Sequence, residues 1–357
     1  MENTGAGRRE EVLALGRVGD EPGEISSGVC KETLRRWYPV KPTVVFETYW
    51  KFAAERQAIF FRRLRGETAP WTDDLVLREF KFTNAYRVLD RVSQYLVRNV
   101  IYAGSQTEEE TFFRTILFKL FNKIETWELL LQRMGEISWA KYRFEAYDAI
   151  LTEAKMSGAR IYSAAYIMPS GSGPLVCPVK HRTHLRLLEM MMRDRTFARL
   201  GDAGSMRRAF EILREYPTIG DFLAYQFVTD VNYSELTRFS EMEFVMPGPG
   251  ARDGIRKCFA DLGGLNEVEL IKRVAVRQAE EFASRGIHFQ SLFGRSLQLI
   301  DCQNLFCEVG KYARVAHPEI KGLSNRTRIK QVFEPNPESI QYFFPPKWSL
   351  SVKMGYM

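Results

Sequence analysis

The sequence predicts a mainly α-helical protein, and two observations support this fold class. From Lys31 onward, apolar residues recur at the spacing of amphipathic helices, and no alternating run supports a sheet-based fold. Of the 357 residues, 45% are hydrophobic and 27% are charged, which is ordinary for a globular protein and excludes a wholly disordered chain. A chain of this length can bury a core in one large domain or in two moderate ones.

The first half of the chain contains three amphipathic segments after a weakly patterned start. Residues 1–30 are rich in Gly and Glu and predict a flexible tail. Residues 43–64 carry aromatic side chains among charges and predict a helix, as do residues 84–100. The apolar run 112–131 follows the acids Glu108–Glu110, which favour a helix start because they oppose the helix dipole.

The second half begins after a break in this pattern. Residues 160–167 allow short strands, and the Pro- and Gly-rich residues 168–174 predict a loop. Residues 335–346 are too rich in proline for a helix and are expected to pack across the body. Further helices are predicted at residues 184–200, 205–216, 221–230, 253–262, 267–285 and 297–315.

Cysteine usage and charge limit the class of protein. The five cysteines are scattered, without the spacing of a disulfide framework or a zinc site, so we expect a cytoplasmic protein with free thiols, no metal and no cofactor. No apolar run reaches the roughly 18 residues that span a bilayer, and Met1–Gly16 lacks the features of a secretory signal. The 51 Lys and Arg exceed the 44 Asp and Glu by 7, which suggests an anionic partner without establishing one.

A tight connection between two predicted helices is the first candidate binding element. Within Tyr216–Ala224, Gly220 allows the backbone to turn closely, and the amides there and at the next helix start point outward together. Such a group of N–H donors binds phosphate, so Thr218, Gly220 and Asp221 are predicted contacts. The alternative is a plain connection between two helices.

A second Gly- and Pro-rich turn, Val245–Asp253, places an acidic residue, Asp253, at the start of a predicted helix. Asp253 is interpreted either as an N-cap or as a catalytic carboxylate. The residues of this turn and helix that are predicted to contact a DNA backbone are Gly248, Gly250, Arg252, Arg256 and Lys257. Residues 62–65 and 180–184 are further basic clusters that could contact phosphates.

The hairpin followed by an aspartate resembles the helix-hairpin-helix superfamily of DNA glycosylases. The resemblance implies two helical lobes with a cleft, and we place a base-pocket lobe at residues 31–204 and a catalytic lobe at residues 205–350, whose C-terminal helices can return to the first lobe. It implies that Asp253 faces the sugar of an extruded nucleotide, where a carboxylate stabilises the developing positive charge. Bifunctional members carry a lysine near the position of Phe222, so a monofunctional enzyme without lyase activity is implied. Asn232 either assists Asp253 or caps its own helix.

A closer resemblance extends from Lys31 to Leu350. The residues that carry it are Phe80–Asn84, Arg87–Arg91, Phe118–Trp127, Pro247–Gly250, Cys307-Glu308 and Lys311-Tyr312. These segments look like a family described as the helical domain of 5-hydroxymethyluracil DNA kinases. Its relatives include α-glutamyl/putrescinyl thymine pyrophosphorylases and anti-phage glycosylases that excise glucosylated 5-hydroxymethylcytosine. Kinase activity is not expected to transfer, because this sequence has no Gly-x-x-x-x-Gly-Lys-Ser/Thr loop.

The block from Phe80 to Gln94 is the candidate base pocket. An extruded base needs aromatic faces for stacking and polar groups that recognise its edge. The candidates are Phe82, Asn84, Arg87, Asp90, Arg91 and Gln94, with Tyr233 from the later stretch. The alternative is that the aromatic residues belong to the core and that the Arg and Asp residues form pairs on a helix surface.

Together these features favour a monofunctional DNA glycosylase that excises a hypermodified pyrimidine, α-glucosylated 5-hydroxymethylcytosine, from phage DNA in anti-phage defence. Its partner would be double-stranded DNA with modified bases, with no membrane and no obligate protein partner. The first alternative is a transferase or pyrophosphorylase that acts on 5-hydroxymethyluracil derivatives still attached to DNA, with Asp253 as general base. The second is a DNA-binding module without catalytic activity.

Overall fold

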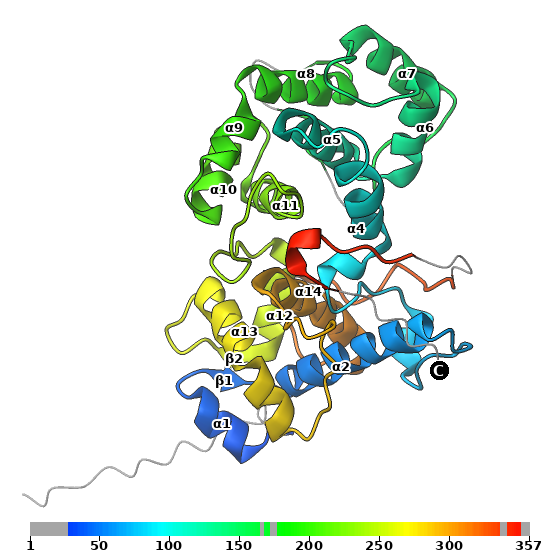
Figure 1. Cartoon of the computed structure of the whole chain (residues 1–357). Coiled ribbons are helices and arrows are strands. Elements are labelled where there is room, and N and C mark those ends of the chain that lie inside the picture. The colour runs from blue at the N-terminus through cyan, green and yellow to red at the C-terminus, as the bar shows by residue number, and fades with distance from the viewer. Residues whose placement is uncertain (1–27, 165–167, 172–176, 336–340, 351–357) are drawn as a thin grey trace, which may run out of the picture.

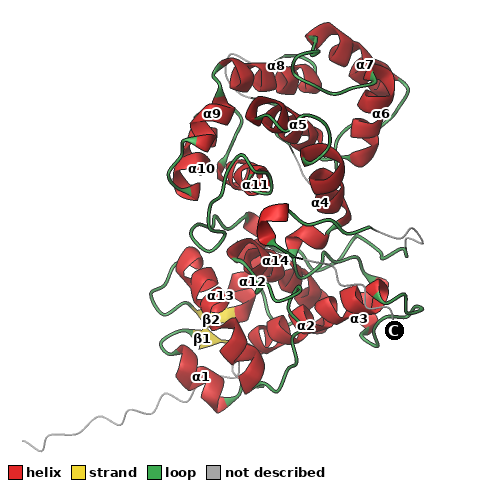
Figure 2. Ribbon diagram, in the orientation of Figure 1, coloured by secondary structure: helices red, strands yellow, loops and turns green. Residues whose placement is uncertain are grey.

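The computed structural model describes residues 28–164, 168–171, 177–335 and 341–350, and the structure of these residues is mainly helical (Figure 2). The α-helices are α1 (Lys31–Trp37), α2 (Val44–Leu64), α3 (Leu75–Glu79), α4 (Arg91–Tyr95), α5 (Glu108–Phe121), α6 (Ile124–Met134), α7 (Phe144–Met156), α8 (Lys180–Arg193), α9 (Thr196–Gly201), α10 (Met206–Arg214), α11 (Asp221–Val231), α12 (Pro249–Cys258), α13 (Glu267–Ser284) and α14 (Leu299–Ala316). The shorter elements are the antiparallel strands β1 (Lys41–Pro42) and β2 (Phe259–Asp261), the 3₁₀ helices η2 (Arg87–Leu89) and η5 (Pro346–Trp348), and the π-helical turn η3 (Leu96–Ile101). The predicted fold class, mainly α, is confirmed.

Several helices lie close to where the sequence places them, because their caps are local. Helix α2 follows Thr43, whose hydroxyl accepts the Val45 amide at 3.2 Å. Helix α13 begins with a capping box between Asn266 and Glu269. The segments predicted at 205–216, 221–230 and 297–315 correspond to α10, α11 and α14.

Other predicted helices are divided or displaced. Residues 84–100 pass through η2, α4 and η3 instead of forming one helix, since Asp90 has an extended backbone between them. Asn122 (φ 48°) and Arg195 (φ 50°) adopt left-handed conformations that divide the apolar runs 112–131 and 184–200. The helix predicted at 253–262 begins at Pro249, where proline suits the first turn, and gives way to β2 at Phe259.

The segments predicted to lack helix have a mixed outcome. Residues 160–164 form no strand, and residues 165–167 lie outside the described part of the chain. Residues 168–171 have neither helix nor strand, as the predicted loop requires, whereas residues 172–174 are not described. Of the predicted tail, residues 1–27 also lie outside the described ranges. Across the described ranges, we find no helix long and apolar enough to cross a bilayer.

The helices form two groups that join near the middle of the molecule (Figure 1). In one group, α14 packs against α2, α12 and α13, so a helix from the first part of the chain meets helices from the last part. In the other, α5 packs against α8, α9 and α11, and α10 packs against α11. Segment 84–101 and the C-terminal η5 lie between the groups (Figure 1). The expected division of the chain near residue 204 stays a prediction.

Helices α12 and α14 approach closely because glycines face each other. A Cβ atom at Gly254 would overlap the carbonyl oxygen of Phe306, and one at Gly310 would lie 2.7 Å from the Gly254 Cα. The Lys257 ammonium donates to the Gly310 carbonyl at 2.8 Å across the same contact. This close packing fixes the position of α12, which carries Asp253, relative to α14.

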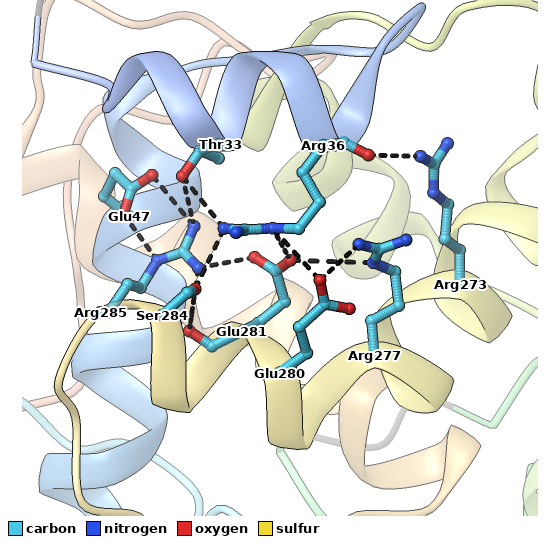
Figure 3. A network of polar contacts seen from close by, with 9 residues as sticks. All are labelled: Thr33, Arg36, Glu47, Arg273, Arg277, Glu280, Glu281, Ser284 and Arg285. Atoms are coloured by element: carbon cyan, nitrogen blue, oxygen red, sulfur yellow. Dashed lines mark hydrogen bonds and ion pairs between the residues drawn. The ribbon is translucent and has the colours of Figure 1, made fainter.

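A network of arginines and glutamates fastens α1 and α13 to α2 (Figure 3). Glu281 is fully buried and accepts from Arg36 at 2.7 Å and from Arg285 at 2.6 Å. Arg285 also bonds both carboxylate oxygens of Glu47 on α2. Because buried charges need partners, this network fixes how the three helices meet.

The described part of the Pro-rich C-terminal segment packs across the join between the two groups. The Phe343 amide donates to the Gln94 side chain at 2.7 Å. The Lys347 ammonium donates to the Ser234 and Thr237 carbonyls, at 2.6 and 2.7 Å. The segment therefore links α4 to the turn that follows α11.

Candidate functional site

The turn Phe82–Asn84 is held by charged side chains from three elements. Arg56 of α2 donates to the Thr83 carbonyl at 2.9 Å and to the Asn84 amide oxygen at 3.2 Å. The Thr83 amide donates to Glu308 of α14 at 2.8 Å, and the next amide, of Asn84, donates to Asp90 at 2.9 Å. Two consecutive amides thus fix two carboxylates side by side.

Partly buried residues of α14 continue this polar surface. Lys311 pairs with Glu308 at 2.8 Å and lies over the Phe82 ring, 4.5 Å from its centroid. Half-buried Cys307 directly precedes Glu308 on α14. We call Arg56, Asn84, Asp90, Cys307, Glu308 and Lys311 the junction site.

The junction site contains a carboxyl group with a shifted pKa. Burial raises the pKa of Asp90 from 3.8 to about 6, while the Asn84 amide opposes the shift and the charge of Glu308 adds to it. A carboxyl group with a pKa near 6 exchanges protons close to neutral pH, which suits a general acid or base. Lys311 and Arg56 supply the positive charges of the same surface.

The Pro247–Gly250 loop borders the junction site. A Cβ atom at Gly250 would overlap the Cys307 sulfur, and one at Gly248 would lie 2.7 Å from the Phe222 ring. Glycine at both positions lets this backbone approach the Cys307 side chain of α14 on one side and the Phe222 ring of α11 on the other. The loop therefore lies between the predicted hairpin and the polar face of α14.

A buried charge cluster lies behind this surface. Asp230, fully buried near the end of α11, bonds both terminal nitrogens of Arg87, at 2.7 and 3.0 Å, and pairs with Lys119 of α5 at 3.0 Å. Arg87 also donates to Gln226 and to the Tyr233 hydroxyl, each at 3.1 Å. We call Arg87, Lys119 and Asp230 the buried triad.

Burial shifts the pKa values of groups around the triad. It lowers the pKa of Lys119 to about 8, against the attraction of Asp230. Burial also raises the pKa of Asp301 to about 7, although that carboxylate accepts the Gln298 and Arg87 amides. The Arg87 backbone thereby connects the triad to α14.

The predicted base-pocket residues divide into two sets. Asn84 and Asp90 are half-buried and belong to the junction site, and Phe82 packs beside it against Phe52 and Tyr312. Arg91 is exposed. The remaining candidates are buried and already bonded: Arg87, Gln94 and Tyr233. A role of any of them in contacting a base stays a prediction.

The two predicted catalytic residues occupy different surroundings. Asp253 lies in the second turn of α12, since the N-cap is Gly248, and its buried carboxylate accepts the Ser324 amide at 2.6 Å. Asn232 is the C-cap of α11, and its side chain bonds Thr237 and both backbone groups of Phe239. Within the described residues, no hydrogen bond joins Asp253 to Asn232. Their catalytic roles stay predictions.

The predicted DNA-contacting residues are also placed. In the hairpin, the left-handed residue is Thr218 (φ 72°), whereas Gly220 has ordinary backbone angles (φ −81°) and caps α11. Asp221 pairs with Arg214 at 2.6 Å. On α12, Arg252 is exposed, Arg256 pairs with Glu267 at 3.2 Å, and Lys257 is buried. The side chain of Lys257 is thus held inside the fold.

Sequence reasoning did not select several residues of the site. Glu308 and Lys119 stand inside segments that carried the family resemblance, so that resemblance was the signal available for them. Arg56 and Asp230 lie in amphipathic helices, where nothing in the sequence distinguishes them from surface charges.

A separate pocket opens between α2, the end of α14 and loop 67–74. It has a volume of about 770 Å³ and is lined by aromatic and charged side chains that include Phe52, Trp71 and Tyr312. Its lining includes Arg62 of the basic cluster 62–65 but none of the predicted catalytic, base-pocket or hairpin residues. Over the described part of the chain, no three His, Cys, Asp or Glu side chains are grouped as metal ligands would be.

Comparison with known proteins identifies the class. This chain belongs to the family described as the helical domain of 5-hmdU DNA kinase, whose model matches residues 43–322. It is 25% identical over 297 residues to a protein named 5-hmdU DNA kinase from Bacillus phage SP10. The alignment covers 77% of this chain and 46% of that protein, so the chain spans about half the length of this relative. No solved structure matches. The resemblance to helix-hairpin-helix glycosylases stays a prediction.

The buried triad generates a stability prediction. Asp230→Asn removes the only charge that faces both cations within the described residues, so we expect the free energy of unfolding to fall by about 3–5 kcal/mol. The matched control is Asp221→Asn on the same helix, whose exposed pair with Arg214 should cost about 0–1 kcal/mol. Urea unfolding measures both. Equal losses in the two variants would contradict the role assigned to Asp230.

The raised pKa of Asp90 predicts a pH dependence. Because the folded protein favours the protonated carboxyl group, the wild type should lose stability relative to Asp90→Asn as the pH rises from about 4 to about 6. Above that interval, the difference between the two proteins should stay constant. Urea titrations from about pH 4 to pH 8 measure it. If the stability of the wild type relative to Asp90→Asn stayed constant or increased between pH 4 and 6, the pKa of Asp90 would not be raised in the folded protein.

Proposed function

We propose that this chain binds duplex DNA carrying a 5-hydroxymethylated pyrimidine and acts on that base at the junction site. Membership of the kinase helical-domain family, with a similar phage protein named for 5-hmdU, supports the substrate class. We choose this site because several segments of the chain come together there. Segments 80–91, 247–250 and 307–312, which lie far apart in the sequence, meet around one polar surface.

The chemistry that fits best leaves the base on its sugar. In this transferase hypothesis, an amine attacks the exocyclic methylene of an activated 5-hydroxymethyluracil, and a C–N bond forms. The C–O bond to the phosphate-type leaving group breaks, and a carboxylate accepts the proton of the amine. The name of the similar protein, 5-hmdU DNA kinase, supports this hypothesis over base excision, because a kinase adds a group to its substrate and does not cleave the bond between base and sugar.

The residues of the junction site have suitable properties for this step. Asp90 is half-buried with a pKa near 6, so it can accept a proton at neutral pH. Lys311 and Arg56 can face the negative charge of a leaving group. Asp253 was the general base expected from the sequence for this hypothesis, but its carboxylate is buried under the Ser324 amide, whereas Asp90 is only half-buried. We therefore assign the proton transfer to Asp90.

Excision by a monofunctional glycosylase is the second candidate. One observation favours it: Asp253 is a buried carboxylate one turn beyond the Pro247–Gly250 loop. In that case the charge of Asp253 would stabilise a sugar cation, and the products would be a free base and an abasic site. α-Glucosylated 5-hydroxymethylcytosine is the corresponding substrate, and defence against phages is the corresponding role.

One assay separates these functions. The protein is incubated with duplexes that contain thymine, 5-hydroxymethyluracil, its pyrophosphorylated form or glucosylated 5-hydroxymethylcytosine, with and without an amine donor. Mass spectrometry of the digested nucleosides should show a heavier nucleoside from the activated base, lost in Asp90→Asn and retained in Asp253→Asn. The asparagine at position 253 keeps an oxygen that can accept the Ser324 amide.

The other outcomes are distinct. A free base with alkali-labile sites, abolished by Asp253→Asn, would replace the transferase by the glycosylase. Preferential binding of modified DNA without any product would indicate a binding module. Equal binding of all the duplexes, without product, would contradict the proposed function.

A further inference from the structure

A strongly basic, exposed segment follows α14. Residues 320–333 contain Lys321, Arg326, Arg328 and Lys330 and no acid. This stretch therefore has a charge of +4 in a chain whose net charge is +7. All four side chains are exposed. We call residues 321–330 the basic loop.

The charges of the basic loop are not paired with acids among the described residues. Arginines elsewhere, such as Arg36, Arg87 and Arg285, form close ion pairs with buried carboxylates. Over the described part of the chain, none of the four cations of the loop forms an ion pair, and the Lys321 ammonium bonds only the Pro318 carbonyl. Unpaired like charges repel one another, which favours an anionic partner at this place.

Both ends of the basic loop are fastened beside the junction site. The Ser324 amide donates to Asp253 on α12. Further on, residues 331–333 pair with residues 79–81 through the bonds Lys81 N–H to Gln331 O and Phe333 N–H to Glu79 O, each 2.9 Å. Residue 81 leads directly into the turn Phe82–Asn84. The loop therefore runs along the rim of the proposed substrate surface.

We infer that the basic loop is the element that grips the DNA backbone around the extruded nucleotide. This inference rests on the proposed function, because it takes duplex DNA as the partner. Four exposed cations without acids can contact the phosphates of a duplex, and such contacts raise affinity without recognising sequence. Asp253 is then a positioning residue, whose carboxylate holds the loop in place.

The loop also presents an apolar side chain. Leu323 is 64% exposed, between Lys321 and Arg326, next to the residue that Asp253 holds. A Cβ atom at Gly322 would overlap the Asp253 carboxylate, so the backbone that carries Leu323 lies directly on α12. An apolar residue held rigidly among phosphate-binding cations can enter the base stack and occupy the space of an extruded base.

The salt dependence of binding tests the backbone contacts. The loop variant carries Lys321→Gln, Arg326→Gln, Arg328→Gln and Lys330→Gln. The control variant changes four exposed basic residues around α7 to Gln, namely Lys141, Arg143, Lys155 and Arg160. Fluorescence anisotropy gives the slope of log K against log salt for a hydroxymethyluracil duplex. The slope is negative, and we expect it to be shallower by about 2 to 4 in the loop variant than in the wild type. The slope of the control should stay within about 1 of the wild-type slope. Equal slopes in the loop variant and the wild type would overturn the inference.

Leu323→Ala tests insertion separately. A 2-aminopurine next to the modified base reports unstacking by its fluorescence. We expect the fluorescence rise on binding to be reduced at least twofold in Leu323→Ala, with the salt slope unchanged, and an unchanged rise would remove Leu323 from the inference. If the loop variant loses its slope while all duplexes bind equally and none reacts, the basic loop is confirmed and the proposed function fails.

Discussion

The carboxylate of Asp230 is the constraint on which the centre of the molecule depends. It is fully buried and faces two buried cations, Arg87 and Lys119, which come from two other parts of the chain. Buried charges of one sign are tolerated only with partners of the other, so the three segments can meet in few other ways. Through the Arg87 amide and Asp301, the same arrangement fixes η2 on α14.

The surface built on this arrangement combines rigid support with usable chemistry. Asp90 directly follows η2, which begins at Arg87, and its position beside Glu308 depends on where η2 lies. The glycines of the Pro247–Gly250 loop bring a second backbone segment against α14. Groups supported from several elements keep their geometry when a substrate binds, as a site acting on one atom of a base requires. The basic loop adds four cations that form no ion pair with any described residue.

The sequence predicts the helices better than it predicts their partners. Thr43 and Asn266 cap their helices with neighbouring residues, so the starts of α2 and α13 could be predicted locally. The breaks at Asp90 and Asn122 could not, because the apolar spacing runs through both and tertiary contacts decide the backbone there. Asp253 was expected at a helix start, yet Pro249 begins that helix. Asp230 pairs with a residue 143 positions away, and no spacing rule reaches so far.

Hydrogen exchange of the full chain with and without a hydroxymethyluracil duplex tests the central claim most directly. We expect the modified duplex to slow amide exchange in residues 80–94, 247–250, 304–311 and 321–330. An unmodified thymine duplex should slow exchange only in the basic loop. Helices α7 and α8 should be unaffected by either. Protection confined to other surfaces, such as the pocket beside Trp71, would contradict the account.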